Sequence, residues 1–401
     1  MNSTVLHKEP IFTRSFTLNF VINFFIYLCM YLLIVIIADY TKTAFHAPDS
    51  LAGLVVGIFV VGSLIGRFIT GRYVNHFGPK KILIFGLLFL VITQLLYFVP
   101  GPLWFLIFTR LMNGLATAVA STATGTIAAC ITPKTRKSEG ISLFSLSLVL
   151  GTAIGPFFGL LLVKSFSIML LFTICIILGI ISLILSLFVH VAFDFTGKYQ
   201  HPHQHNKGFS LQRFIAREAI PVAIIMLLVG LGYASILTFL QFFAEQRHLI
   251  ETSSYFFICY AIASLITRPI AGRLMDEHNE NIVVYPAFIA LIISFVLLVF
   301  SFNPFTLLLA GITLGIGYGN LSSSMQAIAI KVSPPAKYGL ATSTYFIGLD
   351  IGIGFGPSVL GMFTNTISYS NIYLLMALVS TITIVIYFVI HGRKVKHLTP
   401  N

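Results

Sequence analysis

The chain alternates between long apolar runs and short polar breaks. Each run holds about 20 residues, the length that an α-helix needs to cross the hydrocarbon core of a bilayer. The breaks carry proline, glycine or charge, as in FGPKK, TPKTRKSEG and DEHNEN. The pattern predicts twelve membrane-spanning helices, at about residues 16–38, 50–70, 82–99, 103–127, 140–163, 167–190, 219–241, 253–272, 282–301, 304–329, 340–362 and 371–390.

Composition places these helices in lipid rather than in a water-soluble core. The 401 residues are 57% hydrophobic and 9% charged, whereas soluble domains average about 25% charged residues. Most of the 24 Lys and Arg residues fall on one side of the predicted bundle when the N-terminus is placed in the cytoplasm. This asymmetry accounts for the net charge of +12 without nucleic-acid binding. We therefore expect a multi-pass protein of a bacterial inner membrane, with both termini cytoplasmic.

The longest interior polar segment divides the chain into two parts. It covers 191–218 and separates an N-terminal half, 1–190, from a C-terminal half, 219–401, each with six predicted helices. This segment contains three alternating histidines, His201, His203 and His205. Such alternation could bind a transition metal, but a solvated linker is the favoured explanation, and we expect no metal site.

The two halves are copies at a fixed offset of 201 residues. SLIGRFITGR at 63–72 matches SLITRPIAGR at 264–273 in seven of ten positions. The same offset pairs Gly114 with Gly315, Ser121 with Ser322, Gly151 with Gly352, Gly155 with Gly356 and Pro156 with Pro357. Parallel six-helix repeats are a transporter architecture, with the substrate held near the membrane midplane between the halves. A channel or a scaffold can also be duplicated, but the motifs below favour a transporter.

Three motifs resemble those of the major facilitator superfamily. Residues 71–81, GRYVNHFGPKK, look like the family's loop signature G-x-L-x-D-R-x-G-R-K/R-x, with Asn75 in place of the acid. Residues 110–116, RLMNGLA, look like the fourth-span motif R-x-x-x-G. Residues 151–159, GTAIGPFFG, look like the fifth-span motif G-x-x-x-G-P-x-x-G, which marks proton antiporters and exporters in the family. The resemblance implies twelve transmembrane helices in two pseudo-symmetric halves, as in drug/proton antiporters and bacterial sugar or metabolite efflux permeases.

The repeated loop motif implies a gate at the cytoplasmic face. The candidate gate residues are Arg67, Gly71, Arg72, Asn75, Gly78, Arg268, Gly272, Arg273 and Asp276. We expect the arginines to reach headgroups or the ends of neighbouring helices. In the family the loop acid contacts a helix N-terminus of the opposite half. The matching helix starts are 341–344 for Asn75 and 138–139 for Asp276, so only the second copy keeps its acid.

Glycine and proline in the fifth and eleventh spans predict close helix packing and a hinge. These candidate hinge residues are Gly151, Gly155, Pro156, Gly159, Gly356 and Pro357.

Few charges lie inside the predicted spans. A charge buried in lipid is costly, so it normally faces a cavity or a partner. Asp350 is the deepest carboxylate, Arg110 lies in the fourth span, and Asp39 lies near the outer end of the first. These three are the candidates for proton coupling, with a purely structural role as the alternative for Asp350 and Arg110.

Polar stripes at helical spacing predict the substrate cavity. Helices one, four, seven and ten supply Asn19, Asn23, Tyr27, Tyr31, Asn113, Thr117, Tyr233, Gln241, Tyr318 and Asn320. Hydrogen bonding between helices is the competing explanation for each of these residues.

These features together predict a secondary active transporter rather than an enzyme. No phosphate-binding G-x-x-x-x-G-K-S/T or His-Glu-x-x-His pattern is present, so we expect no cofactor and a proton gradient as the energy source. The expected partners are a small amphiphilic or aromatic substrate, protons and lipid, and we expect a monomer. The alternatives are export or flipping of a lipid-linked or metabolite cargo by the same fold, and a sensor without transport.

The missing acid at Asn75 generates a first prediction. Asn75→Asp should strengthen the cytoplasmic contact by about 0.3–1 kcal/mol, because a carboxylate interacts favourably with a helix N-terminus. The population should shift toward the outward-open state, measured by the accessibility of introduced cysteines. Unchanged accessibility would contradict it.

Overall fold

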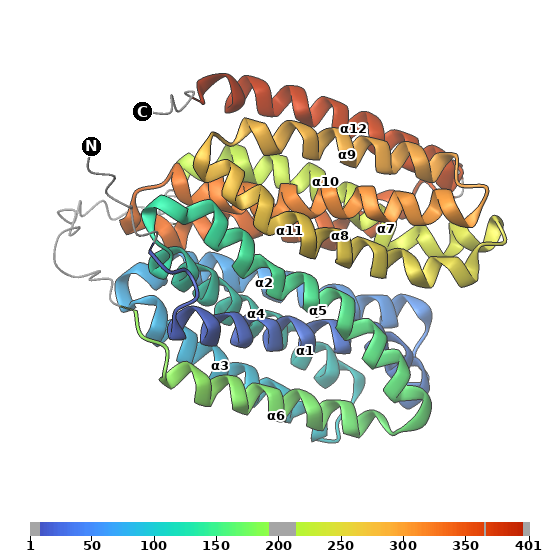
Figure 1. Ribbon diagram of the computed structural model, residues 1–401. Coiled ribbons are helices and arrows are strands. Elements are labelled where there is room, and N and C mark those ends of the chain that lie inside the picture. The colour runs from blue at the N-terminus through green and yellow to red at the C-terminus, as the bar shows by residue number, and fades with distance from the viewer. Residues whose placement is uncertain (1–8, 192–213, 365, 396–401) are drawn as a thin grey trace, which may run out of the picture.

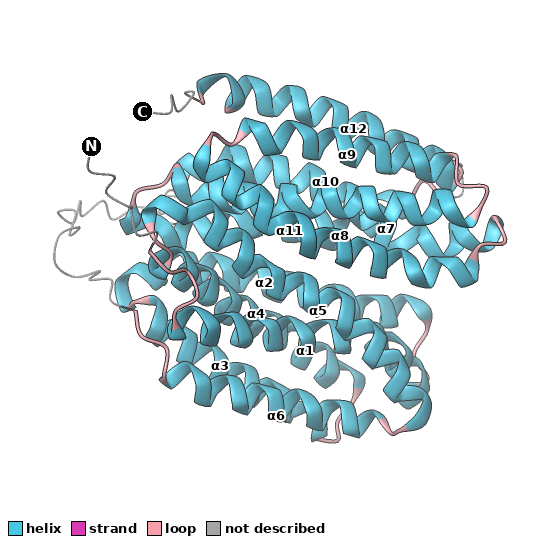
Figure 2. Ribbon diagram, in the orientation of Figure 1, coloured by secondary structure: helices cyan, strands magenta, loops and turns pink. Residues whose placement is uncertain are grey.

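The computed structural model describes residues 9–191, 214–364 and 366–395, and its regular secondary structure there is helical (Figure 2). Twelve long helices confirm the number predicted from the sequence. They are α1 (Arg14–Phe45), α2 (Asp49–Phe77), α3 (Pro79–Leu95), α4 (Leu103–Ile131), α5 (Lys137–Ser165), α6 (Ile168–Leu187), α7 (Ile220–Gln246), α8 (Ile250–Glu277), α9 (Asn281–Val299), α10 (Pro304–Lys331), α11 (Tyr338–Gly361) and α12 (Tyr369–Ile390). Short 3-10 helices cover Leu96–Phe98, Lys134–Arg136, Arg217–Ala219, Pro335–Lys337 and Gly392–Lys394. The three linker histidines lie outside the described residues.

Local sequence explains where these helices begin and why they suit a membrane. Pro79 and Pro304 open α3 and α10, where a missing backbone N–H costs nothing. Gly78, with φ of 83°, makes the left-handed turn between α2 and α3 that a side chain would disfavour. Eleven of the helices are long and apolar enough to cross a membrane. The twelfth, α11, is less apolar because it carries Asp350 among glycines and hydroxyl side chains.

The helices form two bundles that lie side by side (Figure 1). α1 to α6 pack against one another in one bundle and α7 to α12 in the other, and the bundles meet mainly where α2 packs on α11 and α5 on α8. We call these two contacts between the bundles the α2–α11 seam and the α5–α8 seam. The offset of 201 residues maps each seam onto the other. Figure 1 also shows that both described ends of the chain leave the same end of the molecule, which we call the termini-bearing end.

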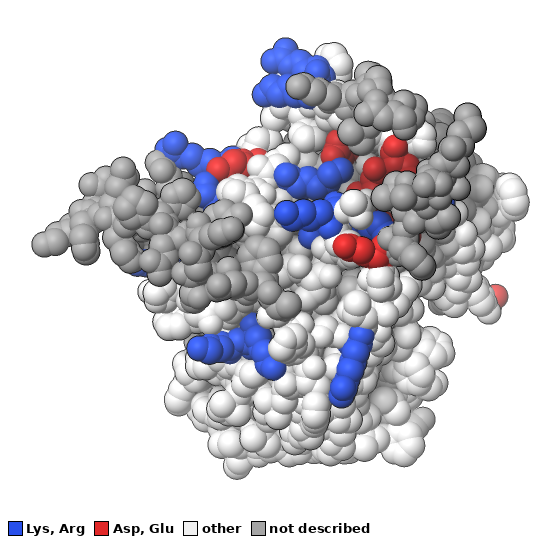
Figure 3. Space-filling view, turned by 60° about the vertical axis from the view of Figure 1, so that its left-hand side comes forward, with Lys and Arg blue, Asp and Glu red and all other residues white. Residues whose placement is uncertain are grey.

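The outer surface is apolar along the helices and charged at the termini-bearing end. Large side chains such as Phe85, Ile180, Ile262 and Leu378 are exposed, as expected of a surface in contact with lipid. Figure 3 shows Lys, Arg, Asp and Glu gathered at the termini-bearing end. Several are paired there, including Arg136 with Glu139 and Lys337 with Glu218.

The repeat is visible in the packing of the two halves. A Cβ atom added to Gly114 of α4 would overlap the carbonyl oxygen of Phe59 in α2. At the offset of 201 residues, a Cβ atom on Gly315 of α10 would meet the carbonyl oxygen of Tyr260 in α8 in the same way. Helix pairs within each half therefore approach until backbone touches backbone.

The candidate hinge glycines also pack helices within a half. Gly151 and Gly155 of α5 lie against Tyr27 and Tyr31 of α1, and Gly159 lies against Leu32. In the other half Gly356 of α11 lies against Ala234 of α7. Pro156 and Pro357 lie inside their helices. The predicted close packing is present, within halves rather than between them, and the hinge role stays a prediction.

This packing predicts the effect of one methyl group. Gly114→Ala should lower the stability of the protein by about 1–3 kcal/mol, because the new Cβ forces α4 away from α2. The matched control is Gly57→Ala in α2, where an added Cβ has nothing within 4 Å. Thermal unfolding of the purified proteins in detergent measures both. Equal melting temperatures for the two variants would contradict the prediction.

Candidate functional site

A buried arginine joins three helices at the seam between α2 and α11. Arg67 is 3% exposed, and its Nε donates to Asp350 Oδ2 at 3.2 Å. Its Nη1 donates to Ser121 Oγ and Thr122 Oγ1 of α4, both at 2.8 Å. Because Arg67 and Asp350 belong to opposite halves, this ion pair holds the halves together in the middle of the bundle.

Asp350 has further partners at the same seam. Its Oδ2 also accepts from Ser63 Oγ at 2.7 Å, one turn of α2 before Arg67. The Arg67 guanidinium stacks over the ring of Phe346 in α11, 4.2 Å from the ring centre. Removing one member of a buried pair leaves an uncompensated charge, which is strongly destabilising. The Asp350 side chain therefore depends on Arg67 and Ser63 across the interface.

The seam between α5 and α8 contains the second copy of this arginine. Arg268 is fully buried, and its Nη1 donates to the carbonyl oxygen and the Oγ of Ser145, both at 2.8 Å. Its Nη2 donates to Ser322 Oγ of α10 at 2.8 Å. The position that corresponds to Asp350 is Val149, which is also buried. This seam therefore lacks the central carboxylate.

The depth of these two arginines corrects the sequence interpretation. Arg67 and Arg268 were expected near the membrane surface, but both are buried. The predicted spans ended at 70 and 272, whereas α2 continues to Phe77 and α8 to Glu277. The second arginine of each repeated phrase, Arg72 or Arg273, is exposed, and the first lies five residues or about 7.5 Å deeper.

Asp276 closes the termini-bearing end of the α5–α8 seam. Its two carboxylate oxygens accept from the backbone N–H groups of Ser138, at 2.9 Å, and Glu139, at 2.8 Å. These residues begin α5, so the helix dipole favours the negative charge. They are also the helix start that the sequence named for Asp276. The side chain of Asn75 is not among those that the structure describes.

Small residues complete both seams at repeat-related positions. Gly272 lies against Ser142 of α5, and Gly71 lies against Ser343 of α11. The Ser343 hydroxyl donates to the carbonyl oxygen of Arg67. A backbone N–H of the linker, from Ala216, donates to Thr344 Oγ1 at 2.9 Å. Among the described residues, the hydrogen bonds between the halves thus run from the middle of the helices to the termini-bearing end.

The structure does not bring the other candidate coupling residues to Asp350. Arg110 lies inside the N-terminal half, where its guanidinium reaches the carbonyl oxygen of Val55 and the hydroxyl of Tyr97, each at 3.4 Å. It also stacks over Phe59, 4.7 Å from the ring centre. Asp39 is exposed. Their place in proton coupling stays a prediction without support from this geometry.

The polar stripe residues mostly bond neighbouring helices of the same half. Asn19 donates to the carbonyl oxygen of Thr124, and Asn23 donates to Ser147 and accepts from Thr124. Asn113 donates to Thr93 of α3, while Thr117 donates to the Asn113 carbonyl oxygen. Asn320 donates to Thr267 of α8. Gln241 is exposed on α7 and has no such helix-to-helix bond among the described contacts, so its place in the cavity stays a prediction.

Tyrosines occupy the centre of the bundle instead. Tyr233 and Tyr318 stack with their ring centres 3.9 Å apart, and Tyr260 lies 5.8 Å from Tyr233. Tyr345 Oη donates to the carbonyl oxygen of Ser322, the residue that binds Arg268. Tyr27 is buried and Tyr31 half-buried on α1. Aromatic faces and hydroxyl groups therefore lie next to the two arginines.

Sequence reasoning missed Ser63, Ser145, Tyr260 and Tyr345. Ser63 carried a signal, because it lies one helical turn before Arg67 in the repeated phrase and so shares its helix face. The other three stand in apolar or small-residue runs and carry no such signal.

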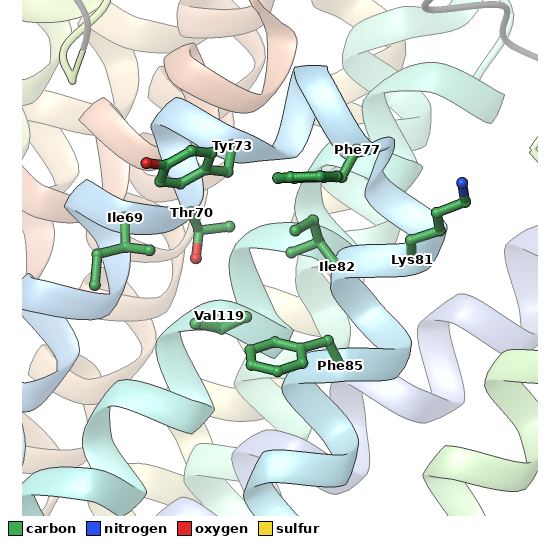
Figure 4. Close-up of a pocket in the computed structure, with 8 residues that line it drawn as sticks. All are labelled: Ile69, Thr70, Tyr73, Phe77, Lys81, Ile82, Phe85 and Val119. Carbon is green, nitrogen blue, oxygen red and sulfur yellow. The ribbon is translucent and has the colours of Figure 1, made fainter.

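A separate groove of about 380 Å³ lies between α2, α3 and α4 (Figure 4). It is lined by Ile69, Thr70, Tyr73, Phe77, Lys81, Ile82, Phe85 and Val119. Most of these side chains are apolar, and Ile69, Tyr73, Phe77 and Phe85 are exposed on the outer surface. We therefore assign this groove to the lipid-facing surface and not to the arginine seams.

Comparison with known proteins agrees with this architecture. A family model described as Major Facilitator Superfamily matches residues 20–279 and 222–401. The uncharacterized MFS-type transporter MJ1560 of Methanocaldococcus jannaschii is 26% identical over 88% of this chain and 92% of its own. The multi-drug resistance efflux pump PmrA of Streptococcus pneumoniae is 26% identical over 78% of this chain and 80% of its own. The crystal structure of the human organic anion transporter MFSD10 (TETRAN) has the same fold, with a TM-score of 0.76 at 14% identity, covering 93% of this chain and 98% of that one.

The Asp276 contact generates a prediction for the seam between α5 and α8. Asp276→Asn should favour opening of the termini-bearing end by about 1–2 kcal/mol, because it removes the charge from a partly buried helix N-terminus. The matched control is Glu277→Gln, which removes a neighbouring exposed carboxylate paired with Arg273. The measurement is the rate of maleimide labelling at Ser142→Cys in a background without the native cysteines. Equal labelling rates in the two variants would count against a closing role for Asp276.

Proposed function

Because the chain belongs to the Major Facilitator Superfamily, we propose that this membrane transporter exports a small amphiphilic or aromatic compound in exchange for protons. In this proposal the protein lies in the cell membrane of a bacterium, and the termini-bearing end faces the cytoplasm. The excess of basic residues on that side of the chain supports this orientation.

Alternating access is supported by how the halves contact each other. Their mutual hydrogen bonds lie between the middle of the helices and the termini-bearing end, at Asp350, Arg268 and Asp276. Within each half, helices touch through backbone at glycines such as Gly114 and Gly315. The two halves are therefore suited to move as rigid bodies that part at the α2–α11 and α5–α8 seams. In this proposal the structure is the state that is closed toward the cytoplasm.

The ion pair between Arg67 and Asp350 is the observation that carries the proposal of proton coupling. It connects a carboxylate of one half to a guanidinium of the other. A proton on Asp350 removes the charge that binds Arg67 and leaves only neutral hydrogen bonds across the seam. Separation of the halves, in turn, takes Arg67 away from the Asp350 carboxylate, and in this proposal a proton replaces it there. Protonation and opening of the cytoplasmic end are coupled in this way.

Export is supported by the relatives and by the fifth-span motif. PmrA is named as an efflux pump for several drugs, and residues 151–159 match the motif that marks exporters. The central tyrosines supply flat apolar faces with hydroxyl groups at their rims, which suit an aromatic or amphiphilic compound.

The coupling role of Asp350 is tested with reconstituted protein. A deletion strain and an overexpressing strain are first screened against toxic compounds and metabolites, and a compound whose tolerance or export changes in opposite directions identifies the substrate. In proteoliposomes, an imposed pH gradient should accelerate transport of this substrate by the wild-type protein tenfold or more. Asp350→Asn should abolish that acceleration, while exchange without a gradient continues. Glu251→Gln, which removes an exposed carboxylate in the first turn of α8, is the control and should keep the gradient response. Gradient-driven transport that survives in Asp350→Asn excludes Asp350 as the coupling carboxylate.

A further inference from the structure

The two arginines at the seams have unequal counter-charges. Arg67 is neutralised by Asp350 at 3.2 Å. Arg268, at the equivalent position, has only neutral acceptors, namely Ser145 and Ser322. Its Nε is buried and has no hydrogen-bond partner among the described residues. Within the described part of the chain, Arg268 therefore carries a positive charge between the two halves that no carboxylate balances.

A full guanidinium charge inside a lipid-embedded bundle is unfavourable without an anion or a complete set of acceptors. Hydroxyl and carbonyl dipoles offset part of this cost in the closed state. The other seam supplies a carboxylate for its arginine. The residue at the equivalent position here is Val149, which belongs to the same buried apolar cluster as Tyr260 and Tyr318.

Opening the cytoplasmic end increases the imbalance. Ser145 lies on α5 in the N-terminal half, and Arg268 lies on α8 in the C-terminal half. Parting of the two helices therefore removes two of the three hydrogen bonds of Arg268, both from Nη1. Ser322, on α10 of the same half, keeps Nη2 in place. The opened state thus presents Nε and Nη1 to the compartment from which an exporter loads.

A cluster of tyrosines lies near this guanidinium. The ring centre of Tyr233 is 3.9 Å from that of Tyr318 and 5.8 Å from that of Tyr260. Tyr260 lies two helical turns before Arg268 on α8, and Tyr345 is linked to it through Ser322. A flat ring can pack on this cluster while an attached oxyanion reaches the arginine.

We propose that Arg268 binds the anionic group of the substrate, and that the exported compound is an aromatic or amphiphilic carboxylate or a similar oxyanion. The inference rests on the proposed export function and names the charge of its substrate. The oxyanion replaces Ser145 on Arg268 when the cytoplasmic end opens, accepts two charge-assisted hydrogen bonds and neutralises the unbalanced charge. Closure of the seam returns Ser145 to Arg268 and releases the anion.

The test uses three naphthalene probes that differ only in one substituent: 2-naphthoate, 2-naphthamide and 2-(aminomethyl)naphthalene. Their binding to the purified full-length protein is measured by probe fluorescence in detergent. We expect the wild-type protein to bind the carboxylate at least tenfold more tightly than the amide, and the ammonium most weakly. A wild-type protein that binds the three probes equally, or binds none of them, overturns the inference.

Variants at the two positions assign the preference to Arg268. Arg268→Gln should remove the tenfold preference for the carboxylate, and Arg268→Lys should restore part of it. Val149→Asp leaves the arginine in place and adds the carboxylate that the other seam already has. It should therefore abolish carboxylate binding and raise ammonium binding about tenfold. The control Val149→Asn places a neutral side chain of the same shape there and should keep the carboxylate preference.

The test still decides for or against an anion site at Arg268 when one of the variants is unstable. If Arg268→Gln does not fold, Val149→Asp decides, and a retained carboxylate preference in that variant overturns the inference. Transport assays separate this inference from the proposed function. Export of neutral or cationic compounds alone overturns the anion site and leaves proton-coupled export standing. Anion binding without any transport overturns the export function and leaves the site standing.

Discussion

Guanidinium groups buried in a lipid-embedded bundle need acceptors, and this need determines how the two halves meet. Arg67 and Arg268 take acceptors from the opposite half, through Asp350 in one seam and Ser145 in the other. Neither guanidinium can lose its acceptors in the opposite half without leaving buried N–H groups unpaired. The halves are therefore held together most firmly where the chain has placed these charges, and the rest of the interface needs only small residues that let α2 approach α11 and α5 approach α8.

Each seam holds one carboxylate, but at a different depth. Asp350 lies in the middle of α11, whereas Asp276 lies near the end of α8 and binds the start of α5. The α2–α11 seam is thus bound by an ion pair deep in the bundle. The α5–α8 seam is bound by a charge at a helix N-terminus near the aqueous phase. The two seams are therefore held by different kinds of contact, a buried ion pair in one and a carboxylate at a helix N-terminus in the other.

The length of the apolar runs and the internal repeat made the fold predictable from the sequence. The depth of individual side chains in the membrane, and the direction in which they point, did not follow from it. Twenty-residue apolar runs located the twelve helices, and the 201-residue offset located both seams and the helix start that Asp276 contacts. The sequence could not predict how deep Arg67 and Arg268 lie in the bundle, because α2 and α8 continue through polar residues beyond the apolar runs. The sequence also could not predict whether Asn113 and Gln241 face a cavity or a neighbouring helix, because polar residues at helical spacing suit both equally well. Arg110 binds Tyr97 and Val55 through contacts that no spacing rule reveals.

The repeat also has an evolutionary consequence. α2 packs on α11 and α8 packs on α5, which is the isologous pairing of a twofold-symmetric dimer of six-helix chains. In such a homodimer every substitution occurs twice, so an acid facing one arginine must also face the other. Fusion into one chain removes that restriction. A symmetric homodimer could not have Val149 in one seam and Asp350 at the equivalent position of the other. This difference allows the two equivalent seams to differ in function.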